Sequence, residues 1–248
     1  MVAMTSTTAT QPAPSSRRER VRASTLAEIK GCALDLMREQ GSTQIHFSDI
    51  ARSMGMTAPA LYRYFTDRDD LLTALIRDAY NDLADSVNSA VSPIDADDDW
   101  GRLRAGMQAY RTWAVTQPER FTLIFGLPIP GFVVDEEAGT TEAAKSAMDA
   151  LMGLVLNASE AGRLVPSVLT HLAPQMAEKM NEKHSAEGIA LPAAASQGVL
   201  HAWMTVHGFV SLEACGQCDW CSEVERDSLF EAQTELAARA IGIAVPAR

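Results

Sequence analysis

FSDIARSMGMTAPALYRYF, the stretch from Phe47 to Phe65, contains two short helical patterns separated by a glycine. Ser48 suits the N-cap of the first helix, because its hydroxyl can accept a hydrogen bond from an amide of the first turn. Gly55 can adopt a positive φ without a Cβ clash, which suits a tight turn. Thr57 is the expected N-cap of the second helix. The stretch therefore predicts a helix-turn-helix, the unit that places its second helix in the major groove of DNA.

The second helix has an apolar side and a polar side. Helical spacing predicts that Leu61 and Phe65 point inward, whereas Tyr62, Arg63 and Tyr64 present polar groups outward. Two short helices of an ordinary all-α core are the alternative interpretation, because a helix-turn-helix pattern alone is only moderately specific.

The flanking sequence strengthens the DNA-binding interpretation. Residues 66–69 fit a capping box that starts a long amphipathic helix from Asp67 to about Val91. With these flanks, residues 24–91 closely resemble the DNA-binding domain of the TetR/AcrR family of bacterial transcriptional regulators. The matching residues are Gly41, Phe47, Ile50, Ala51, Gly55, Leu61, Tyr62, Tyr64, Phe65, Asp69, Leu71 and Leu72. Arg68 departs from the family, which usually has Lys there, but either cation can contact a phosphate.

The resemblance implies which residues contact DNA. The start of the second helix would lie closest to the bases, where Ala58 and Pro59 can offer only apolar contacts such as those to thymine methyl groups. The expected DNA-binding residues are Ser48, Thr57, Ala58, Pro59, Tyr62, Arg63, Tyr64, Arg68, Arg17, Arg18, Arg20 and Arg22.

The N-terminal region is polar and then basic. Residues 1–16 carry no charge and are expected to be disordered. The basic run from Arg17 to Arg22 has two interpretations that the sequence does not separate. It is either a solvated prelude to the first helix or an arm that follows phosphates or enters the minor groove. We therefore expect a disordered arm over residues 1–23, a helix-turn-helix domain over 24–70 and an effector-binding and dimerisation domain over 71–248.

The net charge of −11 is unevenly distributed along the chain. Residues 17–77 hold ten Lys and Arg against eight Asp and Glu, a net charge of +2. Residues 78–248 hold eleven against twenty-four, a net charge of −13. The N-terminal part can therefore approach phosphate, whereas the acidic remainder is repelled by it.

Several classes of protein find no support in the sequence. No stretch is apolar enough to span a membrane, and the N-terminus lacks a secretory apolar core. Four cysteines in 248 residues do not make a disulfide framework. There is no phosphate loop, nucleophile elbow or paired metal-ligand motif. We expect a cytoplasmic protein that is not an enzyme and that has no cofactor, no metal site and no membrane partner.

The remainder of the chain reads as helical, so the expected fold is all-α. A three-helix helix-turn-helix domain would precede a larger helical body for ligand binding and dimerisation. The expected helices span about residues 24–40, 67–91, 100–116, 118–125, 140–161, 166–183, 194–215 and 220–242, with a loop at 126–131. Trp203-x-x-x-His207-Gly208 is similar to the Trp-His-Gly pattern that names one type of C-terminal domain in TetR-like regulators.

The helical body is rich in methionine and aromatic residues. Such a stripe is more often plain core, but it also suits an adaptable apolar pocket between helices. Resemblance to TetR-like regulators implies a small, often apolar, effector in this domain. The expected ligand-binding residues are Met107, Tyr110, Phe121, Phe125, Met152, Met176, Trp203 and His207. We expect the effector to enter between the 67–91 helix and four of these residues, Met107, Tyr110, Phe121 and Met152, and to tilt that helix.

The last two helices are expected to form a four-helix dimer bundle, as they do in TetR-like proteins. Gly208 would permit close helix packing. The expected apolar faces comprise Val199, Leu200, Val206, Val210, Leu229, Leu236 and Ile241.

The sequence thus predicts a homodimeric repressor that binds a palindromic double-stranded DNA operator and is released by a small, apolar effector. The main alternative is a redox- or metal-responsive regulator that uses Cys215, Cys218 and Cys221, although a fourth ligand is missing locally. A DNA-architectural protein without an effector is a third possibility, and an apolar pocket in the body would count against it.

Overall fold

The computed structural model describes residues 16–132, 139–169, 171, 174–189 and 191–247. For residues 176, 183 and 187 within these ranges, only the backbone is described. The described chain is helical and contains no strand, so the all-α prediction is confirmed. The helices are α1 (Arg17–Gln40), α2 (Phe47–Ser53), α3 (Ala58–Leu61), α4 (Arg68–Val91), α5 (Asp99–Thr116), α6 (Pro118–Phe125), α7 (Thr140–Glu160), α8 (Pro174–Glu187), α9 (Ala193–Ala214) and α10 (Glu223–Ile241).

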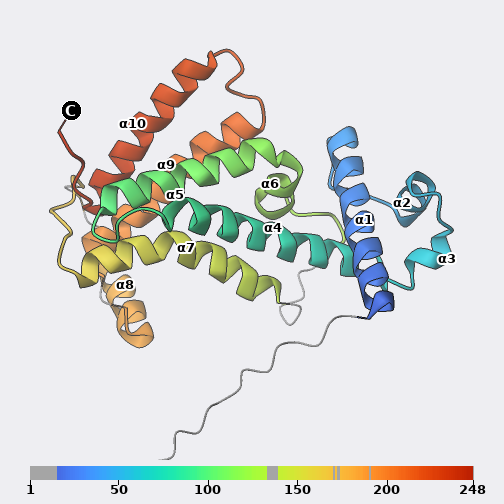
Figure 1. Ribbon diagram of the computed structural model, residues 1–248. Coiled ribbons are helices and arrows are strands. Elements are labelled where there is room, and N and C mark those ends of the chain that lie inside the picture. The colour runs from blue at the N-terminus through green and yellow to red at the C-terminus, as the bar shows by residue number, and fades with distance from the viewer. Residues whose placement is uncertain (1–15, 133–138, 170, 172–173, 190, 248) are drawn as a thin grey trace, which may run out of the picture.

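Helices α1 to α3 form a small N-terminal unit, and α4 leaves it to run into a larger helical body (Figure 1). Helix α4 contributes to two hydrophobic clusters. Leu71 and Leu72 are buried with residues of α1 to α3, whereas Leu83 and Val87 are buried in the body. The long helix is therefore shared by both units.

The first helix begins earlier than predicted. Helix α1 starts at Arg17, because the Ser16 side chain accepts a hydrogen bond from the Glu19 amide while the Glu19 carboxylate accepts one from the Ser16 amide. This capping box satisfies two polar groups of the first turn reciprocally. Residues 17–23 are therefore helical, and the prediction that they belong to a disordered arm is wrong. Residues 1–15 lie outside the described chain.

The helix-turn-helix is present, but its caps differ from prediction. Helix α2 has His46 at the N-cap position, and Ser48 lies within its first turn. Thr57 does occupy the N-cap of α3, yet its side chain makes no capping hydrogen bond. Gly55 turns the chain with a φ of 63°, as predicted.

Helix α8 starts at Pro174, eight residues after the predicted start. The preceding segment instead forms hydrogen bonds with the end of α10. The Val165 amide donates to the Gly242 carbonyl, and the Val168 amide donates to the Arg239 carbonyl. The Ser167 hydroxyl donates to the Ala240 carbonyl. Because these backbone groups already have hydrogen-bond partners in α10, they do not require the hydrogen bonds of a helix.

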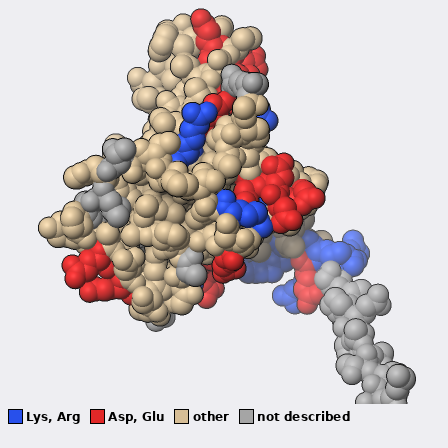
Figure 2. Space-filling model, turned by 90° about the vertical axis from the view of Figure 1, so that its left-hand side faces the viewer, with Lys and Arg blue, Asp and Glu red and all other residues tan. Residues whose placement is uncertain are grey.

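Figure 2 shows the surface of the body, on which acidic patches are prominent, while Lys and Arg gather where the described chain begins. No helix in the described part of the chain has the length and apolarity to cross a membrane.

Candidate functional site

The outer face of α2 and α3 presents most of the residues predicted to contact DNA. Leu61 and Phe65 are buried, as predicted, and Tyr62 and Arg63 between them face outward. Tyr62 is 58% exposed, unusually high for a large aromatic residue. Ser48, Thr57, Pro59, Tyr62 and Arg63 are exposed, and Ala58 and Tyr64 are half-buried. Contact of this face with DNA stays a prediction.

The four basic residues at the start of α1, Arg17, Arg18, Arg20 and Arg22, are all exposed. Arg22 is not a free cation, however. Its Nη1 donates a hydrogen bond of 3.2 Å to the Arg63 carbonyl, and its guanidinium lies 5.3 Å from the centre of the Tyr64 ring. Arg22 therefore connects α1 to the residues that follow α3.

Arg68 also has an intramolecular role. Its Nε donates to the Ile45 carbonyl at 3.2 Å, and its Nη1 lies 3.7 Å from a carboxylate oxygen of Asp69. The side chain is 27% exposed. Arg68 thus fixes the chain just before α2, while its phosphate contact stays a prediction.

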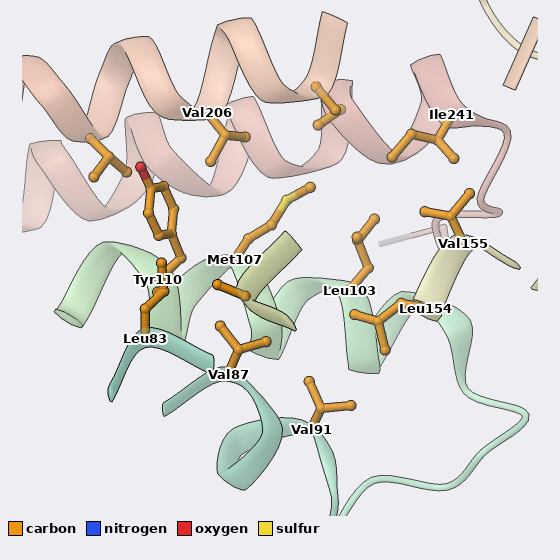
Figure 3. Packing of buried hydrophobic residues seen from close by; sticks show 14 of the residues in the cluster. Leu83, Val87, Val91, Leu103, Met107, Tyr110, Leu154, Val155, Val206 and Ile241 are labelled. Carbon is orange, nitrogen blue, oxygen red and sulfur yellow. The ribbon is translucent and has the colours of Figure 1, made fainter. Parts of the chain in front are cut away.

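An apolar cavity of about 100 Å³ lies in the body between α5, α7 and α9, with Ile241 of α10 closing one side. The side chains that line it are apolar or aromatic, and none is charged. In Figure 3, Leu83, Val87 and Val91 of α4 lie beyond the α5 side chains Leu103 and Met107, away from Val206 and Ile241. No α4 residue of the described chain lines the cavity. This cavity therefore does not lie against α4 as expected, because α5 stands between them, and the place where an effector enters stays a prediction.

The predicted ligand-binding residues divide into two groups. Met107, Tyr110, Met152 and Trp203 line the cavity. Phe121, Phe125 and His207 do not; they pack around Tyr110 in an aromatic cluster at one end of it. The side chain of Met176 lies outside the described residues.

The aromatic cluster contains one polar pair. The Tyr110 hydroxyl and His207 Nδ1 are 2.6 Å apart, and the His207 ring stacks on Trp203 with centroids 4.6 Å apart. Burial raises the pKa of the Tyr110 hydroxyl and lowers the pKa of His207. Both groups therefore stay neutral near pH 7, and the cluster adds no charge to the end of the cavity.

Comparison with known proteins places these features in a family. Residues 32–75 match the model described as bacterial regulatory proteins of the tetR family, and residues 103–237 match the tetracyclin repressor-like C-terminal domain. The HTH-type transcriptional regulator Rv1816 of Mycobacterium tuberculosis is 34% identical over 216 residues, which cover 84% of this chain and 90% of that protein. The chain belongs to the TetR family of bacterial transcriptional regulators.

Solved structures agree with this assignment to the TetR family. The crystal structure of the regulatory protein SCO4313 is 33% identical and matches with a TM-score of 0.69, covering 90% of this chain and 98% of that one. A TetR family regulator from Marinobacter aquaeolei VT8, 16% identical, matches with a TM-score of 0.58 over 92% of this chain and 100% of that one, which supports the fold. TetR-family regulators are non-enzymatic, bind DNA and small-molecule ligands, and act as dimers.

Two ion pairs that each include a buried carboxylate were not identified from the sequence of this TetR-family chain. Arg111, on α5, binds both oxygens of Glu213 and also Asp227, and its side chain is only 7% exposed. Arg38 of α1 binds both oxygens of Glu119 at the start of α6, whose side chain is 2% exposed. A charged residue on the otherwise apolar face of α5 was the available signal for the first pair.

The three cysteines between α9 and α10 do not form a metal centre in the described chain. Cys215 is exposed, Cys218 is half-buried and Cys221 is buried, and all are free thiols. Among the described residues, no three His, Cys, Asp or Glu side chains converge as metal ligands. Burial raises the pKa of the Cys221 thiol, with a smaller contribution from Glu225, and disfavours the reactive thiolate. A redox role for the cysteines stays an untested prediction.

The low pKa of His207 predicts a stability loss in acid. Unfolding returns His207 to its ordinary pKa, so between its lowered folded pKa and about pH 6.5 the unfolded chain binds more protons, and stability falls across that window by at most about 1.4 kcal/mol per pH unit. Thermal unfolding at pH 7.5 and pH 5 should show a smaller acid-induced shift for His207→Gln than for the wild type. The exposed His201→Gln is the control. An equal shift for wild type and His207→Gln would contradict the neutral, buried state.

Proposed function

We propose that this TetR-family chain is a homodimeric repressor that binds a palindromic operator and is released by a small, uncharged, largely apolar effector. The observation that supports this most is the cavity between α5, α7 and α9, whose lining carries no charge. A volume of about 100 Å³ is somewhat smaller than the roughly 150 Å³ apolar cavity that binds benzene in another protein. A compact aromatic or alkyl compound is therefore the best-fitting effector class.

The surfaces of α9 and α10 support dimerisation through a four-helix bundle. Leu200, Met204 and Leu212 are exposed at spacings of four residues or multiples of four, so they share one side of α9. Gly208 lies on the same stripe, and no other atom is within 4 Å of the position of an added Cβ. Leu229 and Leu236 are exposed on α10. This stripe is available for a second copy of the chain.

The predicted dimer faces need correction. Val206, Val210 and Ile241 are at most 4% exposed within one chain, so they belong to its own core, and Val199 lines the cavity. The close helix approach inside the chain occurs at Gly198, where an added Cβ would lie 2.1 Å from the Ala240 carbonyl oxygen.

Met204→Glu should shift the protein from dimer to monomer. Met204 is 61% exposed in the single chain, so a charge there costs little in the monomer but is desolvated in a four-helix interface. Sedimentation at micromolar concentration should give a dimer for wild type and for Val115→Glu, an exposed α5 position outside the stripe. A dimeric Met204→Glu, or a monomeric wild type, would argue against this interface.

Two routes could couple the cavity to the DNA-reading helices. Helices α5 and α7 line the cavity and pack on α4, which carries Arg68 at its start. Helix α6 carries Phe121 and Phe125 of the aromatic cluster, and it also carries Glu119, which binds Arg38 of α1. A ligand that displaces Tyr110 or Trp203 would therefore act on both α4 and α1. Such a ligand must favour the DNA-incompetent state by its own differential affinity.

Selecting binding sites from random-sequence DNA tests the operator proposal. A two-fold symmetric dimer presents two equal reading surfaces, so the selected duplexes should share an inverted repeat. A selected sequence with a single asymmetric site would contradict the palindromic arrangement.

A further inference from the structure

The reading helix is too short to hold its own shape. Helix α3 spans only Ala58–Leu61, and residues 62–64 continue as turns. A helix of one turn has no stability in isolation, because nucleation costs more than its few hydrogen bonds return. The orientation of Tyr62, Arg63 and Tyr64 therefore depends on contacts from neighbouring elements.

One of these contacts comes from α2. The rings of Phe47 and Tyr62 have centroids 5.2 Å apart with an interplanar angle of 54°. Tilted aromatic pairs of this kind are attractive beyond the area that they bury. This contact holds one side of the reading segment.

A second contact comes from the extended start of α1. The capping box at Ser16 and Glu19 makes residues 17–23 helical, which places Arg22 one and a half turns into α1. From there Arg22 Nη1 reaches the Arg63 carbonyl, just beyond the end of α3, where carbonyl groups lack intrahelical partners. The same guanidinium covers the Tyr64 ring. One side chain thus satisfies the backbone and restrains an aromatic ring of the reading segment.

We propose that Arg22 is a positioning residue for sequence-specific DNA recognition, which acts by bracing the reading segment 62–64 against α1 rather than by neutralising a phosphate. The inference rests on the proposed reading of DNA by α3. It assigns to Arg22 a role different from that of the other arginines of the α1 start. Arg18 lies one turn earlier on the same side of α1 and is exposed, and among the described residues it makes no hydrogen bond or ring contact with α3.

Comparing R22Q with R18Q separates the two roles, because each variant removes one positive charge from the same helical extension. The probes are an operator duplex selected by the wild type and a random-sequence duplex of equal length. R22Q loses an exposed hydrogen bond and a cation–π contact that R18Q keeps. The operator affinity of R22Q should therefore be about tenfold lower than that of R18Q. The two variants should bind the random duplex equally. R22K should not restore operator affinity, because an ammonium cannot reproduce the planar, two-sided contact.

Salt dependence and amide exchange complete the test. If Arg22 only neutralised a phosphate, R22Q and R18Q would lower the affinity for both duplexes alike, and R22K would restore it. The slope of log K against log salt concentration would fall by about 0.9 in magnitude for R22Q. That pattern would overturn the proposal. Without DNA, R22Q should speed hydrogen exchange at residues 61–65 relative to R18Q, and equal exchange would also overturn it. If the wild type selects no operator, the proposed function fails, while the exchange comparison still tests the brace.

Discussion

Arg111→Ala should lower the melting temperature by about 6–15 °C, corresponding to a loss of about 3–5 kcal/mol for breaking a buried ion pair in a chain of this size. Arg111 and Glu213 are only 7% and 8% exposed, and the guanidinium lies 4.9 Å from the centre of the Phe230 ring. Removing Arg111 leaves a buried carboxylate whose remaining cation, Arg226, is 3.4 Å away. The ion pair joins α5 to α9, and its contact with Asp227 extends to α10.

Arg104→Ala is the matched control for this prediction. Arg104 lies on the same helix and pairs with Glu231 at 2.7 Å, but its side chain is 54% exposed. Exposed ion pairs contribute about 0–1 kcal/mol, so this variant should melt within a few degrees of the wild type. Melting temperatures are measured by circular dichroism. Comparable values for the two variants would show that the buried Arg111 pair contributes no more to stability than the exposed Arg104 pair.

Ala202→Leu should abolish the response to effector while leaving operator binding intact. Ala202 is 5% exposed and lines the cavity, and three added carbon atoms would occupy most of its volume of about 100 Å³. Because the added atoms enter existing space, the cost of overpacking should be small, on the order of 1 kcal/mol. Effector affinity should fall at least about thirtyfold, since the ligand would have to displace packed side chains.

The control for Ala202→Leu is Ala105→Leu, the same substitution on α5 at a half-buried position outside the cavity lining. Operator binding of both variants, with and without effector, is measured by fluorescence anisotropy. If Ala202→Leu is still released from operator at the wild-type effector concentration, the effector binds elsewhere.

The local features of the fold could be predicted from the sequence. Pro118 and Gly126 bound α6 where expected, and the apolar period of α4 ended at Val91 as expected, because such signals lie within a few residues of each other. The start of α1 was also encoded locally, by the pair Ser16 and Glu19, but the basic run from Arg17 to Arg22 left open whether the segment is a prelude to the helix or an arm.

Features that depend on packing between distant segments could not be predicted in the same way. Val206 and Leu200 are both apolar residues of one helix, and only the helices that pack against α9 decide that Val206 is buried and Leu200 exposed. Likewise, His207 was expected in the pocket wall, but its hydrogen bond to Tyr110 turns it into the adjoining aromatic cluster. The pattern of a single helix does not say which neighbour covers which face.

An effector bound in the cavity between α5, α7 and α9 should weaken operator binding, and operator DNA should weaken effector binding. The direct measurement is calorimetric titration of a neutral aromatic or alkyl effector, found by screening for operator release, into the protein alone and into its operator complex. Linkage requires that operator DNA weaken effector binding by the factor with which the effector weakens DNA binding, about 5–150-fold for a coupling of 1–3 kcal/mol. Equal effector affinities in the two titrations would contradict the account, even if the protein binds both partners.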